Sequence, residues 1–178
     1  ILNSAHMHKD HRRPAMRKQK GFSLIELLIV VAIILIIAAI AIPNLLRSRI
    51  AANEASAVGS LRTINTAEVT YAATYPTQGF ATDLGTLGGT AATASSASAL
   101  LLDNVLGAVG GVPGTPNTKS GYQFYITASG SAPISSYMSN GNPVTVQQTG
   151  VRYFYSDSSG VIRYNTTATA SSSDSPLQ

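Results

Sequence analysis

The dominant pattern in this sequence is an apolar run near its N-terminus, from Phe22 to Ile42. Ser23 and Glu26 carry the polar side chains of the run, and Pro43 follows it directly. A helix of about 20 apolar residues crosses the ~30 Å hydrocarbon core of a bilayer. The pattern therefore predicts a membrane-spanning helix with one carboxylate near its start. A lone ionisable group at such a depth is a candidate functional residue.

A helical pattern continues beyond the apolar run. Residues that share one face at 3.6 residues per turn are Leu46, Ile50, Ala57, Leu61, Ile64, Tyr71 and Tyr75. Residues that mostly lie outside this face are Arg47, Arg49, Asn53, Ser60 and Arg62. Pro43 lacks an N–H, so we expect it to kink or locally open the helix. Pro76 disfavours helical geometry in the residue before it. The prediction is one helix over 22–75, roughly 80 Å long. Glu68 lies at the edge of the apolar face, where the pattern does not explain it.

The second half of the chain alternates turn residues with short apolar segments. We predict a long connection over 76–120 with a short helix over 98–106; connections of this length are usually functional surface. Predicted strands cover 122–127, 144–146, 151–155 and 161–164, the last two flanking a hairpin turn over 157–160. The segment 166–175 is rich in Ser and Thr, and it is expected as a surface arm, a disordered tail or a strand along the sheet edge. The expected fold class is α+β: one long N-terminal helix whose distal half packs on a small, mainly antiparallel sheet of three or four strands.

Charge is distributed unevenly along the chain. Six of the twelve Lys and Arg residues precede the apolar run, namely Lys9, Arg12, Arg13, Arg17, Lys18 and Lys20. Together with Asp10 they give residues 1–21 a charge of +6 − 1 = +5, whereas the whole chain carries +4, so 22–178 carry −1. Basic residues beside a membrane span stay on the cytoplasmic side. We therefore expect this segment to orient the span; a nucleic-acid-binding tail is the alternative.

The residue types needed for catalysis are missing or misplaced. The chain has no cysteine, and its histidines (His6, His8 and His11) all lie in the basic segment. No nucleophile motif or phosphate loop occurs, so we expect no enzyme and no cofactor. Asp157 and Asp174 are weak candidate ligands for calcium, because their spacing fits no strict calcium loop. The histidines form an equally weak metal candidate.

The residues from Gly21 to Ala32 (Gly-Phe-Ser-Leu-Ile-Glu-Leu-Leu-Ile-Val-Val-Ala) resemble the class III signal of type IV prepilins and type II secretion pseudopilins. The resemblance spans Lys20 to about Leu46, and beyond that only the general architecture, the pilin fold, is similar. It implies that a membrane peptidase cuts after Gly21, that the new terminal Phe22 is N-methylated, and that Glu26 is the assembly carboxylate. A plain single-pass anchor is the alternative. Many type IV pilins close a C-terminal loop with a disulfide, which this chain lacks.

The resemblance implies a division of the chain into six parts. These are a removed basic leader (1–21), the transmembrane or filament-core half of the helix (22–43), its amphipathic half (44–75), a connecting loop (76–120), the sheet (121–165) and a tail (166–178). Met16 is suspected as the true start, because Met16 to Gly21 alone would form a leader of typical length. The leader would be removed by the cut that leaves the apolar helix on the mature protein.

The implied function is that of a structural subunit of an extracellular type IV pilus-like filament that serves adhesion or motility. Its partners would be copies of itself, the prepilin peptidase, an assembly platform in the bacterial inner membrane, and the membrane before assembly. Glu26 would pair with the Phe22 amine of a neighbouring subunit; protonation, or pairing with its own terminus, is the alternative. The other candidate functions are a type II secretion pseudopilin of a periplasmic pseudopilus, and a minor pilin with a binding role. Nucleic-acid binding is disfavoured, because residues 76–178 contain only Lys119, Arg152 and Arg163 as basic residues.

Overall fold

The computed structural model describes residues 21–128 and 130–177. Most of the basic segment, with its histidines and Met16, lies outside the described residues, and the expectations placed on it remain predictions. The chain divides into two compact units, residues 1–41 and 42–178, and each is described by itself. Helix α1 (Leu24–Thr74) supplies residues to both units and contains Pro43.

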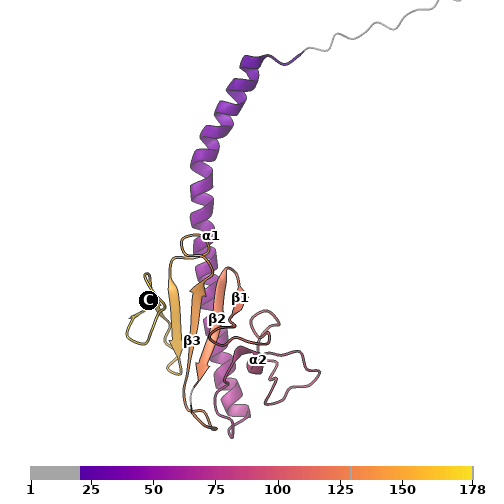
Figure 1. Cartoon of the computed structure of the whole chain (residues 1–178), viewed down its shortest axis with the longest axis vertical. Coiled ribbons are helices and arrows are strands. Elements are labelled where there is room, and N and C mark those ends of the chain that lie inside the picture. The colour runs from indigo at the N-terminus through magenta and orange to yellow at the C-terminus, as the bar shows by residue number, and fades with distance from the viewer. Residues whose placement is uncertain (1–20, 129, 178) are drawn as a thin grey trace, which may run out of the picture. The chain divides into compact units, whose positions relative to one another are not determined.

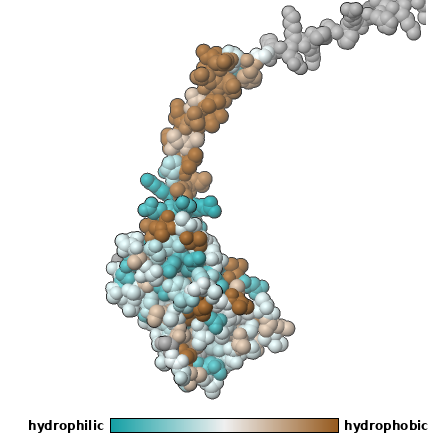
Figure 2. All heavy atoms as spheres, in the orientation of Figure 1, coloured by the Kyte–Doolittle hydropathy of each residue, from teal (hydrophilic) through white to brown (hydrophobic). Residues whose placement is uncertain are grey.

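The first unit presents apolar side chains on every side of the helix. Its large apolar residues are exposed by 46% at the least, the value for Val30 and Val31, and by up to 80% for Phe22 and Leu24. Figure 2 shows this stretch as a continuous hydrophobic surface. A helix that is hydrophobic all round belongs in a membrane or a protein interior. By length and composition, α1 can cross a membrane.

The second unit contains a six-stranded antiparallel sheet in which every strand pairs with the next along the chain. The strands are β1 (Asn117–Lys119), β2 (Tyr122–Ala128), β3 (Tyr137–Pro143), β4 (Tyr153–Asp157), β5 (Arg163–Asn165) and β6 (Ser175–Pro176). The longest pairing joins β2 to β3, from Tyr122 opposite Pro143 to Ala128 opposite Tyr137. Figure 1 shows the sheet lying along the C-terminal part of α1.

The core lies between the sheet and this part of α1. The fully buried helix residues Leu61 and Ile64 belong to one apolar cluster with Tyr122, Phe124 and Phe154 of the sheet. Alternation along β2, whose residues Tyr122, Phe124 and Ile126 are all buried, supplies the sheet's inner face. The expected α+β class is confirmed. The pattern places Ser60 outside the apolar face, yet it is only 6% exposed. A wider part of the helix surface is therefore buried than the apolar stripe indicates.

One of the predicted strands is corrected by the structure. The segment 144–146 is no strand: it forms a turn in which Val146 makes one isolated bridge to Gly150. The strand lies just before it, in β3, whose residues Ser139, Asn140 and Gly141 do not carry the β-branched signature of a strand. The hairpin over 157–160 is confirmed as the link between β4 and β5, and Gly160 has the positive φ of 73° that such a turn requires.

The connection over 76–120 is held by burial rather than by regular structure. The predicted helix over 98–106 is wrong: this segment forms turns, and Leu100 adopts a φ of 56°. Its apolar residues Leu102 and Leu106 are instead buried in the core. A short helix, α2 (Leu84–Leu87), lies earlier in the connection, where the carboxylate of Asp83 accepts a hydrogen bond of 2.7 Å from the Thr86 N–H at its start.

The Ser/Thr-rich tail lies along the sheet edge. Strand β6 pairs with β5, and Ala170 is buried within the segment that leads to it. The side-chain amide of Asn140 donates a hydrogen bond of 3.0 Å to the Ala170 carbonyl. Of the three expectations for the tail, the edge strand is therefore the correct one.

Candidate functional site

The predicted cleavage site lies in three exposed residues that precede α1. Gly21, Phe22 and Ser23 are not helical, and the first helical hydrogen bond runs from the Leu27 N–H to the Ser23 carbonyl at 3.2 Å. A Cβ added to Gly21 would meet no atom within 4 Å. Packing within the described residues does not require a glycine here.

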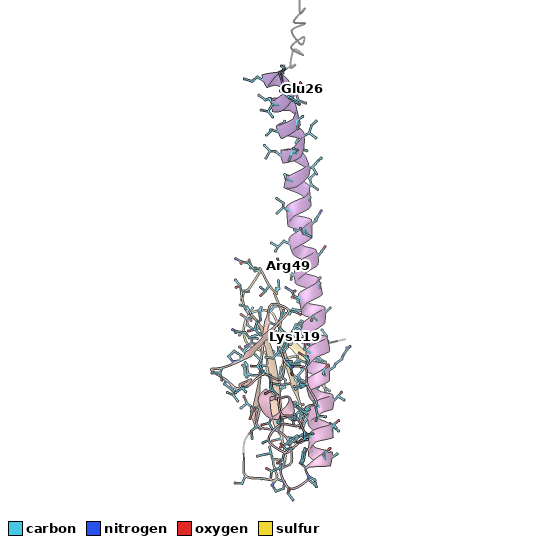
Figure 3. The ribbon with its side chains drawn as sticks, turned by 90° about the vertical axis from the view of Figure 1, so that its right-hand side faces the viewer. Glu26, Arg49 and Lys119 are labelled. Carbon is cyan, nitrogen blue, oxygen red and sulfur yellow. The ribbon has the colours of Figure 1, made fainter. Side chains whose placement is uncertain are left out.

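Glu26 lies in the first turn of α1 and is exposed, as Figure 3 shows. Within residues 21–128 and 130–177, the ion pairs are Lys119–Asp103 and Arg152–Glu54, and Glu26 takes part in neither. A carboxylate is favourable near a helix N-terminus, but the apolar surface around it does not supply a partner. The assembly role expected of Glu26 stays a prediction.

Pro43 lies inside α1, and it is the second residue of the second unit. The helix continues on both sides of it. The kink expected at Pro43 stays a prediction. The sequence-based candidates Gly21, Phe22, Glu26 and Pro43 thus all lie in or just before the first part of α1.

The two weak metal candidates, Asp157 and Asp174, each accept hydrogen bonds from nearby groups of the chain. The carboxylate of Asp157 accepts a hydrogen bond of 2.9 Å from the Ser159 N–H. That of Asp174 accepts one of 2.7 Å from the Ser171 N–H and one of 2.8 Å from the Asn165 amide. Among the described residues, no group of three or more His, Asp or Glu side chains could hold a metal ion. Both carboxylates act as turn residues in the structure.

Glu54 is a buried carboxylate that the sequence pattern did not single out. Its Oε1 accepts hydrogen bonds from the Val151 and Arg152 N–H groups at 2.9 and 3.0 Å, and its Oε2 accepts one from Arg152 Nε at 2.7 Å. Burial raises the pKa of Glu54, but these backbone and guanidinium donors outweigh it, so the pKa lies below its usual value. Glu54 therefore fixes the connection between β3 and β4 to α1.

We predict that Glu54→Ala lowers the free energy of unfolding by about 3 kcal/mol, because it leaves two backbone donors and a guanidinium without their acceptor. The lowered pKa adds a pH dependence: the stabilisation by Glu54 is present above pH 4.5, the unfolded value, and is lost as the pH falls through the folded pKa. Urea unfolding of both chains at pH 7 and pH 3 measures this. Equal midpoints at pH 7 would contradict the prediction, and Lys119→Ala, which breaks an exposed ion pair alone, is the control.

Glu68 is the second buried carboxylate, and it is fully inaccessible. Its Oε2 accepts a hydrogen bond of 2.8 Å from the Ala81 N–H, while Oε1 has no partner among the described residues. Burial raises the pKa of Glu68 to about 8; the Ala81 N–H opposes this rise and the Asp83 carboxylate adds to it. At neutral pH the side chain is thus mainly a neutral acid that ties α1 to the connection. Its position at the edge of the apolar face was the only sequence signal for it.

Comparisons with known proteins found a family and a relative that each match part of the chain. The family described as the prokaryotic N-terminal methylation motif matches residues 16–42. The type IV wide pilus major component PilA4 of Thermus thermophilus is 67% identical over 39 residues. That match covers 22% of this chain and 30% of the relative's length, so it concerns a minor part of each protein. No solved structure matches the chain.

Proposed function

We propose that the chain, which carries an N-methylation motif, is a pilin-like protein and the main structural subunit of a type IV pilus-like filament. The observation that carries the proposal is an exposed, non-helical Gly21–Phe22 bond directly before an apolar helix. The relative is described as a major component of a pilus, which is a structural role. The chain would accordingly act by assembling and not by catalysis.

Processing is proposed to occur between Gly21 and Phe22. A peptidase needs an extended, accessible substrate, and α1 begins only at Leu24. Glycine has no Cβ, so the backbone can approach an enzyme closely. Since Gly21 meets no atom of its own chain that a Cβ would disturb, recognition by the peptidase is the reason we propose for this glycine. The new Phe22 amine would then be N-methylated.

Assembly is proposed to pair Glu26 with the Phe22 amine of a neighbouring subunit. Both groups would lie at the start of an apolar helix, where each charge alone is costly and an ion pair is tolerable. The exposed apolar surface of the first unit would leave the lipid and pack against the same surface of other copies. Small residues such as Ala38, Ala39 and Ala41 would allow these helices to approach closely.

The proposed life of the protein starts in the bacterial inner membrane. The basic leader would stay on the cytoplasmic side, and the prepilin peptidase and an assembly platform would act on the inserted chain. The assembled filament would lie outside the cell and serve adhesion or motility. The relative is a major component of a wide pilus, which favours a pilus over a pseudopilus for this chain. The absence of cysteine is the observation that keeps the type II secretion pseudopilin as the second candidate.

Mass spectrometry on two fractions of the native cells tests this proposal. Sheared extracellular material and washed envelope are digested, and the N-terminal peptide is identified in each. We expect a peptide that begins at Phe22 and is heavier by one methyl group, most abundant in the sheared fraction. Its confinement to the envelope would favour the pseudopilin. Recovery of only uncut chains through Gly21 and Phe22 would contradict the proposal.

A further inference from the structure

A second candidate binding surface lies where α1 begins to pack against the rest of the second unit (42–178), which we call the head. We name it the collar: Leu46, Arg47, Arg49 and Ile50 on α1, with Val144, Val146 and Val151 on the connection between β3 and β4. Arg47, Ile50 and Val151 line one depression of about 420 Å³ together with Glu54 and Arg152. Figure 2 shows hydrophilic and hydrophobic side chains next to each other in this region, and Figure 3 places Arg49 on α1 at the start of the head.

The collar is built into the fold rather than left to a loose loop. The Asn53 amide donates a hydrogen bond of 2.9 Å to the Thr149 carbonyl, and the Glu54 carboxylate accepts from the Val151 N–H at 2.9 Å. The two contacts fix the β3–β4 connection beside α1. In this position Val144 and Val146 remain 46% exposed and Val151 38% exposed. The fold of the head therefore holds three valines towards solvent.

The charge of the collar is opposite to that of the mature chain. Residues 22–178 carry −1, yet Arg47 and Arg49 lie within three residues of each other. Neither takes part in an ion pair or a side-chain hydrogen bond among the described residues, where Arg152 pairs with Glu54 and Lys119 with Asp103. Arg47 borders the exposed Val151, and Arg49 projects from another side of the same helical turn. Two free guanidinium groups around the helix, with exposed valines on one side, match a partner that surrounds the helix with anionic groups.

The position of the collar in the chain selects that partner. Arg47 follows Ile42, the end of the apolar run, by five residues, or about 8 Å of helix. The polar layer on each side of a bilayer is of similar depth, about 5–7 Å. We propose that the collar docks on anionic phospholipid headgroups of the membrane that holds the unassembled chain, with Arg47 and Arg49 on the phosphates and the valines against the headgroup layer. This inference rests on the membrane insertion proposed above.

The proposal gives the head a defined place before assembly. Arginine side chains also reach along apolar surface with the charged end in the headgroup layer. Each basic residue held at an anionic surface contributes about 1 kcal/mol of binding, or about fivefold in the ratio of docked to free heads. Loss of both arginines should therefore lower this ratio about 25-fold. Extraction into a filament would have to release these contacts.

A single fluorophore can test the docking, because the chain has no cysteine. Val146→Cys places an environment-sensitive label on the collar, and Val161→Cys places the same label on a valine of similar exposure, 39%, at the opposite end of β4. The full chain is inserted into vesicles of phosphatidylcholine alone or with about 30% phosphatidylglycerol, a strongly anionic surface. We expect a blue shift and quenching by lipid-borne quenchers for position 146 in the anionic vesicles, and neither for position 161. Arg47→Gln with Arg49→Gln, or about 1 M salt, should abolish both effects.

Three outcomes would overturn the proposal. A label at position 146 that stays in water in both vesicles shows that the head does not dock. A blue shift that the double arginine variant leaves unchanged shows that the arginines do not bind the phosphates. A shift that appears only at high protein-to-lipid ratio assigns the collar to a second copy of the chain. Carbonate extraction is carried out in parallel: a chain that fails to insert contradicts the proposed function itself, whereas an inserted chain with an unshifted label contradicts the docking alone.

Discussion

Replacing Glu26 with alanine is expected to leave cleavage after Gly21 intact and to reduce assembled filament roughly tenfold or more. Removing one partner of a buried ion pair strands the other at a cost of about 3–5 kcal/mol, here the Phe22 amine of a neighbouring subunit. Processing should be spared, because the peptidase acts on residues before α1, which begins at Leu24. The measurement is the amount of Phe22-terminated chain in the sheared fraction relative to the envelope.

Two further variants make this experiment specific. Leu27→Ala removes an apolar side chain next to Glu26 and keeps the carboxylate, so it should assemble far better than Glu26→Ala. Glu26→Asp keeps the charge on a shorter side chain and should restore part of the assembly. Filaments of normal yield from Glu26→Ala would reject intersubunit pairing, and so would an equal loss in Leu27→Ala.

Replacing Glu68 with glutamine is expected to stabilise the head at pH 9 by several kcal/mol. The pKa of Glu68 rises from 4.5 in the unfolded chain to about 8 in the folded one. Its contribution to stability is therefore complete below pH 4.5 and is lost as the pH rises through about 8, at about 1.4 kcal/mol per pKa unit. Glutamine is neutral at every pH, and its carbonyl can still accept from the Ala81 N–H.

The measurement is urea unfolding of the full chain in mild detergent at pH 5, 7 and 9, followed by the near-ultraviolet signal of its eight tyrosines. Glu68→Gln should show a flatter pH dependence than the parent chain, with the two converging at pH 5. Burial also raises the pKa of Tyr71 and of Tyr137, and the charge of the nearby Glu68 carboxylate raises both further. These phenols therefore stay protonated at pH 9 and do not confound the result. A parent chain as stable at pH 9 as at pH 5 would refute the prediction.

The features of this protein that could be predicted from its sequence are those that depend on neighbouring residues. A local pattern of side chains predicts the apolar run after Gly21, the long helix α1 and the hairpin turn that ends at Gly160. Strand β3 could not be recognised, because Ser139, Asn140 and Gly141 lack β-forming side chains and are extended only through pairing with β2 and β4. Pairing across the sheet overrides local preference there.

The carboxylates discussed above also differ in how far the sequence identifies them. Glu26 stands out because it interrupts an apolar run, whereas Glu54 and Glu68 lie on a helix that also carries other polar residues. What distinguishes them is a partner far along the chain: Arg152 for Glu54 and Ala81 for Glu68. No local pattern encodes such a contact, since it exists only after the connection has folded against α1.

The sequence by itself determined the apolar helix, the motif around Gly21 and the α+β class, because an apolar run of this length and a signal of adjacent residues act without a folded partner. Only the tertiary structure decided that the connection after α1 is held by buried leucines and not by a helix, and that the tail becomes the edge strand β6. It also decided which carboxylates are buried. The physical reason is that burial and strand pairing join residues distant in the chain, and their energies outweigh local propensity.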